Sequence, residues 1–183
     1  MPLKKRGDGR SVLVAAARLE FEEFGFEGTN SNAIARRAGY APQTFYRHFQ
    51  DKRAIFLAVY EDWSRSEFQT LEAVRTASQF ADTVIEHHRT HRVFRQSLRY
   101  LSVTDPLVSA TRARARQVQI AGMCARLAVF AAMTASERVT TILTIERICD
   151  AIVDGEYAAL DVDPSDSRRC LVDVLQKLGL PED

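Results

Sequence analysis

The sequence predicts an all-α protein that consists of a small N-terminal three-helix domain followed by a larger helical domain. Apolar residues recur at helical spacing through both parts of the 183-residue chain. No segment alternates polar and apolar residues for long enough to indicate a β-sheet. Eight glycines and five prolines are too few for a disordered or fibrous chain. The chain is therefore expected to fold around a substantial core.

The first helix of the N-terminal domain, which is predicted to cover residues 1–52, runs from about Ser11 to Phe24. Its apolar side contains Leu13 and Ala17. Gly25 follows and is expected to end the helix. This helix is expected to pack behind the two helices that follow it.

The stretch TNSNAIARRAGYAPQTFYRHF, residues 29–49, is predicted to form two short helices at an angle. Asn30 can cap the first helix, because its side-chain oxygen can accept a backbone N–H two or three residues further on. Gly39 can adopt the positive φ that a helix end often needs, and Pro42 suits the first position of the next helix. Phe45 and Phe49, four residues apart, are expected to anchor that helix to the core. Two helices joined by a short glycine turn indicate a helix-turn-helix, whose second helix enters the major groove of DNA.

The side chains on the outer face of this motif are candidates for DNA contacts. Gln43, Arg47 and Asn32 are the candidates for base edges, because paired groups of Gln and Asn match adenine and those of Arg match guanine. Hydroxyls and cations bind phosphates and fix the register without reading sequence. The other members of the predicted DNA-binding set are Pro42, which starts the helix, and the phosphate candidates Ser31, Thr44, Tyr46, His48 and Lys52.

The sequence from about residue 11 to residue 60, which contains this motif, resembles the N-terminal domain of TetR-family repressors. The resemblance implies an all-helical homodimer, in which three helices read DNA and the remainder binds a small effector. Ala41 stands where the family often has Ser or Thr to cap the recognition helix, so the start of that helix is expected to be less firmly held. The segments that carry the resemblance are Gly25–Thr29 (GFEGT), Ile34–Gly39 (IARRAG), Thr44–Phe49 (TFYRHF) and Lys52.

The second domain is predicted to cover residues 53–183 and to be helical throughout. A long helix is expected to begin at Lys52 behind Asp51 as its cap, and another behind Asp105. The periodicity places the helices at about residues 52–74, 79–91, 93–103, 106–133, 136–160 and 165–178.

The last two helices carry more apolar surface than one neighbour can cover, which predicts partners on more than one side. Two such helices from each of two subunits would close a four-helix interface, as the resemblance also implies. The alternative is a larger core within a single subunit. The residues predicted at a dimer interface are Ile145, Ile148, Ile152, Leu171, Val174, Leu175 and Leu178.

A small-molecule effector is expected to bind among the helices between residues 79 and 160. Pockets of this kind are mostly apolar, and the composition of this region favours a hydrophobic or aromatic effector. Ordinary core packing is an equally good explanation for each candidate residue. The candidates are Phe94, Tyr100, Met123 and Phe130.

His87, His88 and His91 form a cluster that resembles a metal site, since His87 and His91 lie one helical turn apart. Arg89 and Arg92 flank the cluster and disfavour a cation, so an exposed polar helix face is the preferred interpretation. Neither a metal nor a cofactor is predicted. The sequence also contains no GxSxG, P-loop, GxGxxG or HExxH motif, so an enzyme is not predicted.

The charges separate along the chain. Residues 1–53 contain ten Lys and Arg against six Asp and Glu, a net charge of +4, and the remainder has fifteen against eighteen, a net charge of −3. A basic head on a mildly acidic body favours phosphate contact through the head alone. Cys124, Cys149 and Cys170 form no CxxC pair and are interpreted as reduced thiols of a cytoplasmic protein. Neither a signal peptide nor an apolar stretch of about 20 residues is recognised, so no membrane span is predicted.

The sequence therefore predicts a transcriptional repressor that binds a palindromic operator on double-stranded DNA as a homodimer and is released by a small, hydrophobic effector. Two alternatives remain open. One is a helical small-molecule-binding protein or enzyme that retains a non-functional DNA-binding head. The other is a DNA-binding protein with no ligand.

Overall fold

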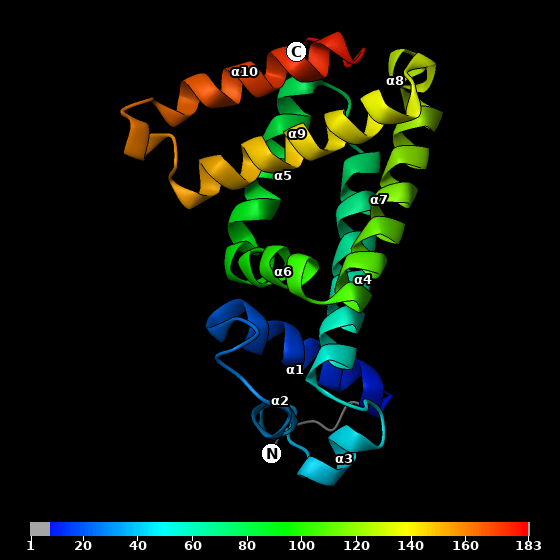
Figure 1. Cartoon of the computed structure of the whole chain (residues 1–183), viewed down its shortest axis with the longest axis vertical. Helices are drawn as coiled ribbons and strands as arrows, with labels where there is room; N and C mark the ends of the chain where they lie inside the picture. The colour runs from blue at the N-terminus through cyan, green and yellow to red at the C-terminus, as the bar shows by residue number, and fades with distance from the viewer. Residues whose placement is uncertain (1–7, 183) are drawn as a thin grey trace. The chain divides into compact units, whose positions relative to one another are not determined.

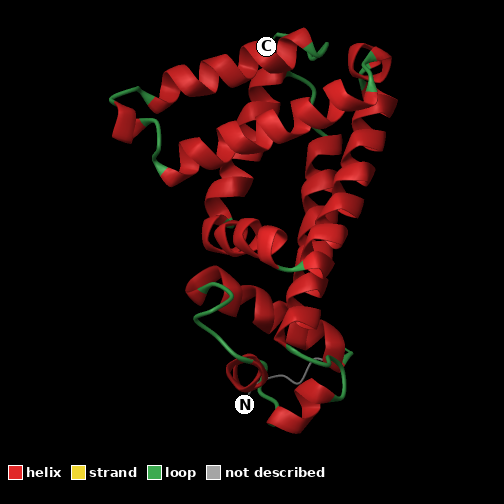
Figure 2. Ribbon diagram, in the orientation of Figure 1, coloured by secondary structure: helices red, strands yellow, loops and turns green. Residues whose placement is uncertain are grey.

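The computed structural model describes residues 8–182, and these form α-helices and one short 3₁₀ helix without a strand among them (Figure 1, Figure 2). The all-α class predicted from the sequence is confirmed. The elements are α1 (Gly9–Phe24), α2 (Ser31–Arg37), α3 (Pro42–Tyr46), α4 (Lys52–Glu72), α5 (Ala77–Thr90), α6 (Arg92–Thr104), α7 (Pro106–Arg126), α8 (Ala128–Ala132), α9 (Ala135–Asp154), η1 (Ala158–Leu160) and α10 (Pro164–Lys177).

The chain divides into two compact units. The first contains the chain up to Ser64 together with Val93–Ser109, and the second contains Arg65–Arg92 and the chain from Ala110 onward. This division differs from the predicted boundary at residue 52, because the first part of α4 and most of α6 share a core with the N-terminal helices.

The core of the first unit is built from aromatic rings. Phe21, Phe56 and Phe94 are fully buried. The ring of Phe21 lies edge-on to that of Phe56 with centroids 5.1 Å apart, and Phe94 stacks on Phe56 at 4.7 Å. Burial of each such ring contributes about 1.5–3 kcal/mol to stability, so α1, α4 and α6 are held together mainly by these contacts.

Several predicted helix starts are confirmed by their side-chain caps. The Asp51 carboxylate accepts the backbone N–H of Ala54 at 2.7 Å at the start of α4. The Asp105 carboxylate accepts the N–H of Leu107 at 2.8 Å at the start of α7. Each bond satisfies a backbone donor that has no partner inside its helix.

Two predicted helices end earlier than the periodicity suggested. The helix expected over residues 106–133 breaks at Leu127, which adopts an extended conformation and separates α7 from α8. This break allows both Leu127 and Phe130 to enter the core of the second unit. The helix expected over residues 136–160 ends at Asp154, because Gly155 follows in the left-handed conformation at φ 79°.

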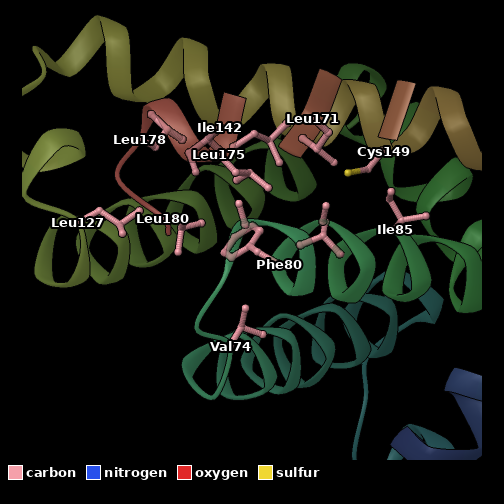
Figure 3. Close-up of a cluster of buried hydrophobic side chains, with 14 of the residues drawn as sticks. Val74, Phe80, Ile85, Leu127, Ile142, Cys149, Leu171, Leu175, Leu178 and Leu180 are labelled. Atoms are coloured by element: carbon pink, nitrogen blue, oxygen red, sulfur yellow. The ribbon is translucent and has the colours of Figure 1, made fainter. Parts of the chain in front are cut away.

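The core of the second unit lies among α5, α9 and α10, which contact one another pairwise (Figure 3). Phe80 and Ile85 of α5 face Cys149 of α9 and Leu171 and Leu175 of α10 in this core. The same packing corrects part of the predicted dimer interface. Four of its members are buried in the chain's own core and are not accessible to a partner subunit: Ile145, Leu171, Leu175 and Leu178.

The remaining predicted interface residues, Ile148, Ile152 and Val174, are half-buried. The apolar side chains that α9 does expose are Val139 and Leu143, whose relative accessibilities are 46% and 40%. They lie one turn apart and therefore on the same side of the helix.

Candidate nucleic-acid interface

The first helix of the helix-turn-helix, α2, starts at the predicted cap. The side-chain oxygen of Asn30 accepts the backbone N–H groups of Asn32 and Ala33, both at 3.0 Å. Ile34 and Ala35 are fully buried and hold the helix to the first unit. Asn32 is exposed, so its amide lies on the outer surface at the first turn of α2.

The turn between α2 and α3 depends on Gly39. This residue has a φ of 74°, which strains any residue with a Cβ. The N–H of Gly39 donates to Arg36 O at 3.0 Å, and the N–H of Tyr40 donates to Ala35 O at 2.9 Å. These two bonds form a Schellman motif, which satisfies the last carbonyls of α2 and sets the direction in which α3 leaves.

The recognition helix, α3, is anchored on one side and open on the other. Phe45 is fully buried and Phe49 is 5% exposed, whereas Tyr46 is 58% exposed. Gln43 and Arg47 are also exposed. The outward face thus presents an amide, a phenol and a guanidinium, which together can donate to base edges and phosphates in a major groove.

The start of α3 has the weakness that the sequence predicted. Ala41 occupies the cap position in an extended conformation and makes no side-chain hydrogen bond, while Pro42 follows at the first helical position. Thr44 is half-buried and its N–H donates to Ala41 O at 2.9 Å. The helix relies on these backbone contacts and on the Phe45 anchor.

A buried carboxylate, Glu20 of α1, supports the motif from behind. It accepts a hydrogen bond from the Thr29 hydroxyl and one from Arg37 Nε at 2.6 Å. Arg37 also donates to Glu23. Burial alone would raise the pKa of Glu20, but the hydrogen bonds from Thr29 and Arg37 outweigh it and the pKa lies below its usual value. This network joins α1, the loop before α2 and the end of α2.

Lys52 has a different place from the one predicted. Its ammonium donates to Phe26 O at 2.6 Å and to Thr29 O at 3.0 Å, and it lies 4.1 Å from the centre of the Phe26 ring. These contacts close the loop between α1 and α2. A structural role for Lys52 is therefore better supported than the predicted phosphate contact, which stays untested.

The structure adds Arg10 to the basic residues near α3. Its guanidinium lies 5.2 Å from the centre of the Phe49 ring, and Arg10 is exposed. The adjacent Gly9 lies close to His48, since a Cβ there would be 2.9 Å from His48 Nε2. Arg10 and His48 therefore extend the donor surface of α3 toward the start of α1. The sequence signal for Arg10 was its position in the first turn of α1.

The predicted effector residues are divided between the two units. Phe94 and Tyr100 belong to the first unit, and Met123 and Phe130 belong to the second. Phe94 and Phe130 are fully buried in packed cores, Tyr100 is 63% exposed, and Met123 packs against the core. Apolar character alone did not distinguish core positions from pocket walls.

The histidine cluster is also divided. His88 is 2% exposed, and its Nδ1 lies 2.9 Å from the Asp150 carboxylate, whereas Nε2 of His87 lies 3.9 Å from Glu67. His88 therefore belongs to the core and not to the exposed face predicted for the cluster. Among residues 8–182, no three His, Cys, Asp or Glu side chains are arranged to hold a metal ion. None of the helices described has both the length and the apolar character that a membrane crossing requires.

Comparison with known proteins agrees with this geometry. Residues 13–59 match the family model of bacterial regulatory proteins of the tetR family. The HTH-type transcriptional regulator UidR of Escherichia coli K12 is 28% identical over 169 residues, which cover 90% of this chain and 76% of that protein. The uncharacterized HTH-type transcriptional regulator YdgC of Bacillus subtilis is 36% identical over 62 residues, 33% of this chain and 32% of that relative.

Solved structures agree on the fold. A TetR-family regulator from Rhodococcus sp. superposes with a TM-score of 0.69 and 16% identity, and the alignment covers 93% of this chain and 97% of that one. At that identity the likeness concerns the fold alone. The motif, the outward donors at α3 and the match over residues 13–59 together identify an N-terminal DNA-binding domain of the tetR-family type, and over most of its length this chain is similar to an HTH-type transcriptional regulator.

Proposed function

We propose that the protein is a repressor that binds a palindromic operator as a homodimer and leaves it when a small molecule binds. Two recognition helices would enter successive major grooves about 34–36 Å apart, one turn of DNA. Repression would follow from occupation of promoter DNA. Because that DNA is cytoplasmic, we infer that the protein acts in the cytoplasm.

The observation that carries this proposal is the two-sided character of α3. Phe45 of α3 and Phe49, three residues beyond its end, are buried on the inner side. Gln43 and Tyr46 of α3 and Arg47 at its C-cap are exposed donors on the outer side. Folding alone does not explain why an amide, a guanidinium and a phenol are all exposed on one side of this segment, because none of them is needed to bury its inner side. We assign Gln43 and Arg47 to base edges and Tyr46 to a phosphate.

We further infer that α9 and α10 form the dimer interface, through their exposed sides. Val139 and Leu143 supply exposed apolar surface on α9, and the half-buried Ile148 and Ile152 form a second apolar stripe on the other side of the helix. Pairing with a second copy would remove this surface from water. A dimer is also needed to cover both halves of a palindrome.

Effector control would act through the three points where the chain passes between the two units, after Ser64, Arg92 and Ser109. α6 is joined to the head by Ser97 Oγ, which accepts the Phe26 N–H at 2.9 Å. A ligand in the second unit that favours one position of these segments would change the spacing of the two heads. A ligand with equal affinity for both states would change nothing.

Selection of bound duplexes from a random pool at low salt tests the proposal. We expect enrichment of an inverted repeat, and loss of binding to the repeat as salt rises. Failure to enrich any inverted repeat would favour the alternative of a helical ligand-binding protein or enzyme with a non-functional head. A thermal-shift screen against metabolites separates the ligand-free alternative, because a real effector raises the melting temperature with its concentration.

A further inference from the structure

The second unit contains a cavity of about 480 Å³ between the end of α4 and one side of α5. This volume is within the range of small-molecule sites. The residues that line it differ from the predicted effector candidates. Leu71 and Val84 supply apolar surface, and Glu67, His87 and His91 supply polar groups.

Glu67 supplies a buried carboxylate to the lining of the cavity. The residue is 6% exposed, and its carboxylate accepts a hydrogen bond from the Gln119 amide at 3.3 Å. Nε2 of His87 lies 3.9 Å from the other carboxylate oxygen. The rings of His87 and His91, which also line the cavity, meet edge-to-face with centroids 4.7 Å apart. A buried carboxylate at a cavity wall attracts a cation more strongly than an exposed one, because the local dielectric is lower.

Every Asp, Glu, Lys or Arg side chain that lines the cavity is acidic. Among the lining residues, the carboxylates are Glu67, Asp82 and Glu86, and no Lys or Arg is included. Asp82 and Glu86 lie at the exposed rim, where Arg168 and Arg89 pair with them from outside the lining. A ligand carboxylate would therefore meet like charge at the interior end, which is unfavourable.

We propose that this cavity binds an organic ammonium ion, with its charged nitrogen toward Glu67 and its apolar body against Leu71 and Val84. The inference rests on the proposed ligand-responsive function and names the chemical class of that ligand. The ammonium supplies the donors and positive charge that Glu67 accepts, while the imidazole faces and aliphatic side chains exclude water from the body.

Isothermal titration of the full chain tests the ligand class. The probes are hexylammonium and 2-phenylethylammonium, compared with the neutral alcohols hexanol and 2-phenylethanol and with the anions hexanoate and phenylacetate. At least one ammonium probe should bind, and its alcohol and carboxylate counterparts should bind about tenfold more weakly or not at all. Absence of binding by every ammonium probe, or equal binding of an alcohol or a carboxylate, overturns the inference.

Two variants localise the binding. Glu67→Gln should weaken the ammonium probe at least tenfold, and Glu72→Gln, the same change at an exposed position of the same helix, should leave its affinity unaltered. Thr70→Trp changes an exposed lining residue, so it should obstruct the cavity without disturbing the core. If Glu67→Gln does not fold, Thr70→Trp decides the question. Undiminished binding to a folded Glu67→Gln protein, or to Thr70→Trp, contradicts the site.

Gel shift on the selected duplex separates this inference from the proposed function. If the protein binds an ammonium probe but no operator, the proposed repressor function is refuted and the proposed ligand class is supported. If the protein binds the operator but no ammonium probe, the proposed regulatory function is supported and the proposed ligand class is refuted.

Discussion

Lys52 illustrates how the structure can give one side chain a role that its motif does not indicate. Its position at the start of α4, beside a DNA-binding helix, suggested a phosphate contact. In the structure its ammonium bonds two carbonyl oxygens, those of Phe26 and Thr29. Hydrogen bonds to a charged group contribute about 1.5–3 kcal/mol each when they are lost from a folded protein. Removal of the Lys52 ammonium is therefore expected to lower the free energy of unfolding more than it changes DNA binding.

Lys52→Met keeps the apolar stem and removes the ammonium. We expect its free energy of unfolding to fall by about 1–3 kcal/mol, with the slope of log affinity against log salt unchanged. Arg10→Ala should have the opposite effect, because the Arg10 guanidinium is exposed and lies over the outer side of the Phe49 ring: the free energy of unfolding should change little, and the slope should fall by about 1. Urea unfolding and salt titration of DNA binding check both. A reduced slope with full stability in Lys52→Met would restore the phosphate role.

Glu20 gives the head a dependence on pH. Its pKa is lowered from the unfolded value of 4.5, with burial opposing and the Thr29 and Arg37 hydrogen bonds producing the shift. The contribution of the Glu20 carboxylate to the free energy of unfolding is therefore fully present above pH 4.5, and it is lost as the pH falls through the pKa that Glu20 has in the folded protein. Glu20→Gln should be less stable at neutral pH, by about 1–2 kcal/mol, and the difference from the unmodified protein should shrink below pH 4.5. A difference that stays constant from pH 7 to pH 3 would show that the carboxylate charge is not involved.

At the scale of the helix, some helix ends are set by local sequence signals and others by tertiary packing. Asn30, Gly39, Asp51 and Asp105 act through bonds to residues within five positions, so their roles could be predicted from the sequence. The break at Leu127 could not, because no glycine or proline lies between residues 123 and 135. There the helix ends so that Leu127 and Phe130 can be buried, and that choice depends on helices far away in sequence.

The missing cap of α3 leads to a prediction. Ala41→Ser places an oxygen where it can accept the N–H of Gln43 or Thr44, since residue 41 already has the extended conformation of a cap. We expect the free energy of unfolding to rise by about 0.5–1 kcal/mol and DNA affinity to rise slightly, because less ordering is needed on binding. The unmodified protein is the control, because its alanine lacks the oxygen. Equal stability of Ala41→Ser and the unmodified protein would mean that the cap does not form.

At the scale of the molecule, the subunit interface was only partly predictable. The sequence showed that the last two helices are unusually apolar, but it could not show which side faces the chain's own core. Leu171 and Leu175 face that core, and Val139 and Leu143 remain exposed. For a related reason, the sequence could not distinguish a pocket wall from a core position: Phe94 and Phe130 are apolar, as a pocket wall would be, but both are buried in packed cores.

Dimer formation through α9 can be tested by introducing a charged side chain on its exposed apolar face. Leu143→Glu places a carboxylate on the exposed apolar face of α9 and should convert the dimer to a monomer, as seen by sedimentation velocity over a range of concentrations. Val118→Glu changes an exposed valine of α7, 62% accessible, and should leave the dimer intact. A protein that is monomeric without any substitution, or a Leu143→Glu protein that remains dimeric, would exclude this interface.

The reading of DNA by α3 is tested most directly by parallel selection of random duplexes with the unmodified protein and with Gln43→Ala. We predict that the unmodified protein enriches an inverted repeat. The variant should lose preference at one base pair in each half-site, symmetrically, with discrimination there reduced by about 1–3 kcal/mol and other positions kept. An identical preference from both proteins, or an equal loss of affinity for every sequence, would contradict the assignment of Gln43 to a base edge.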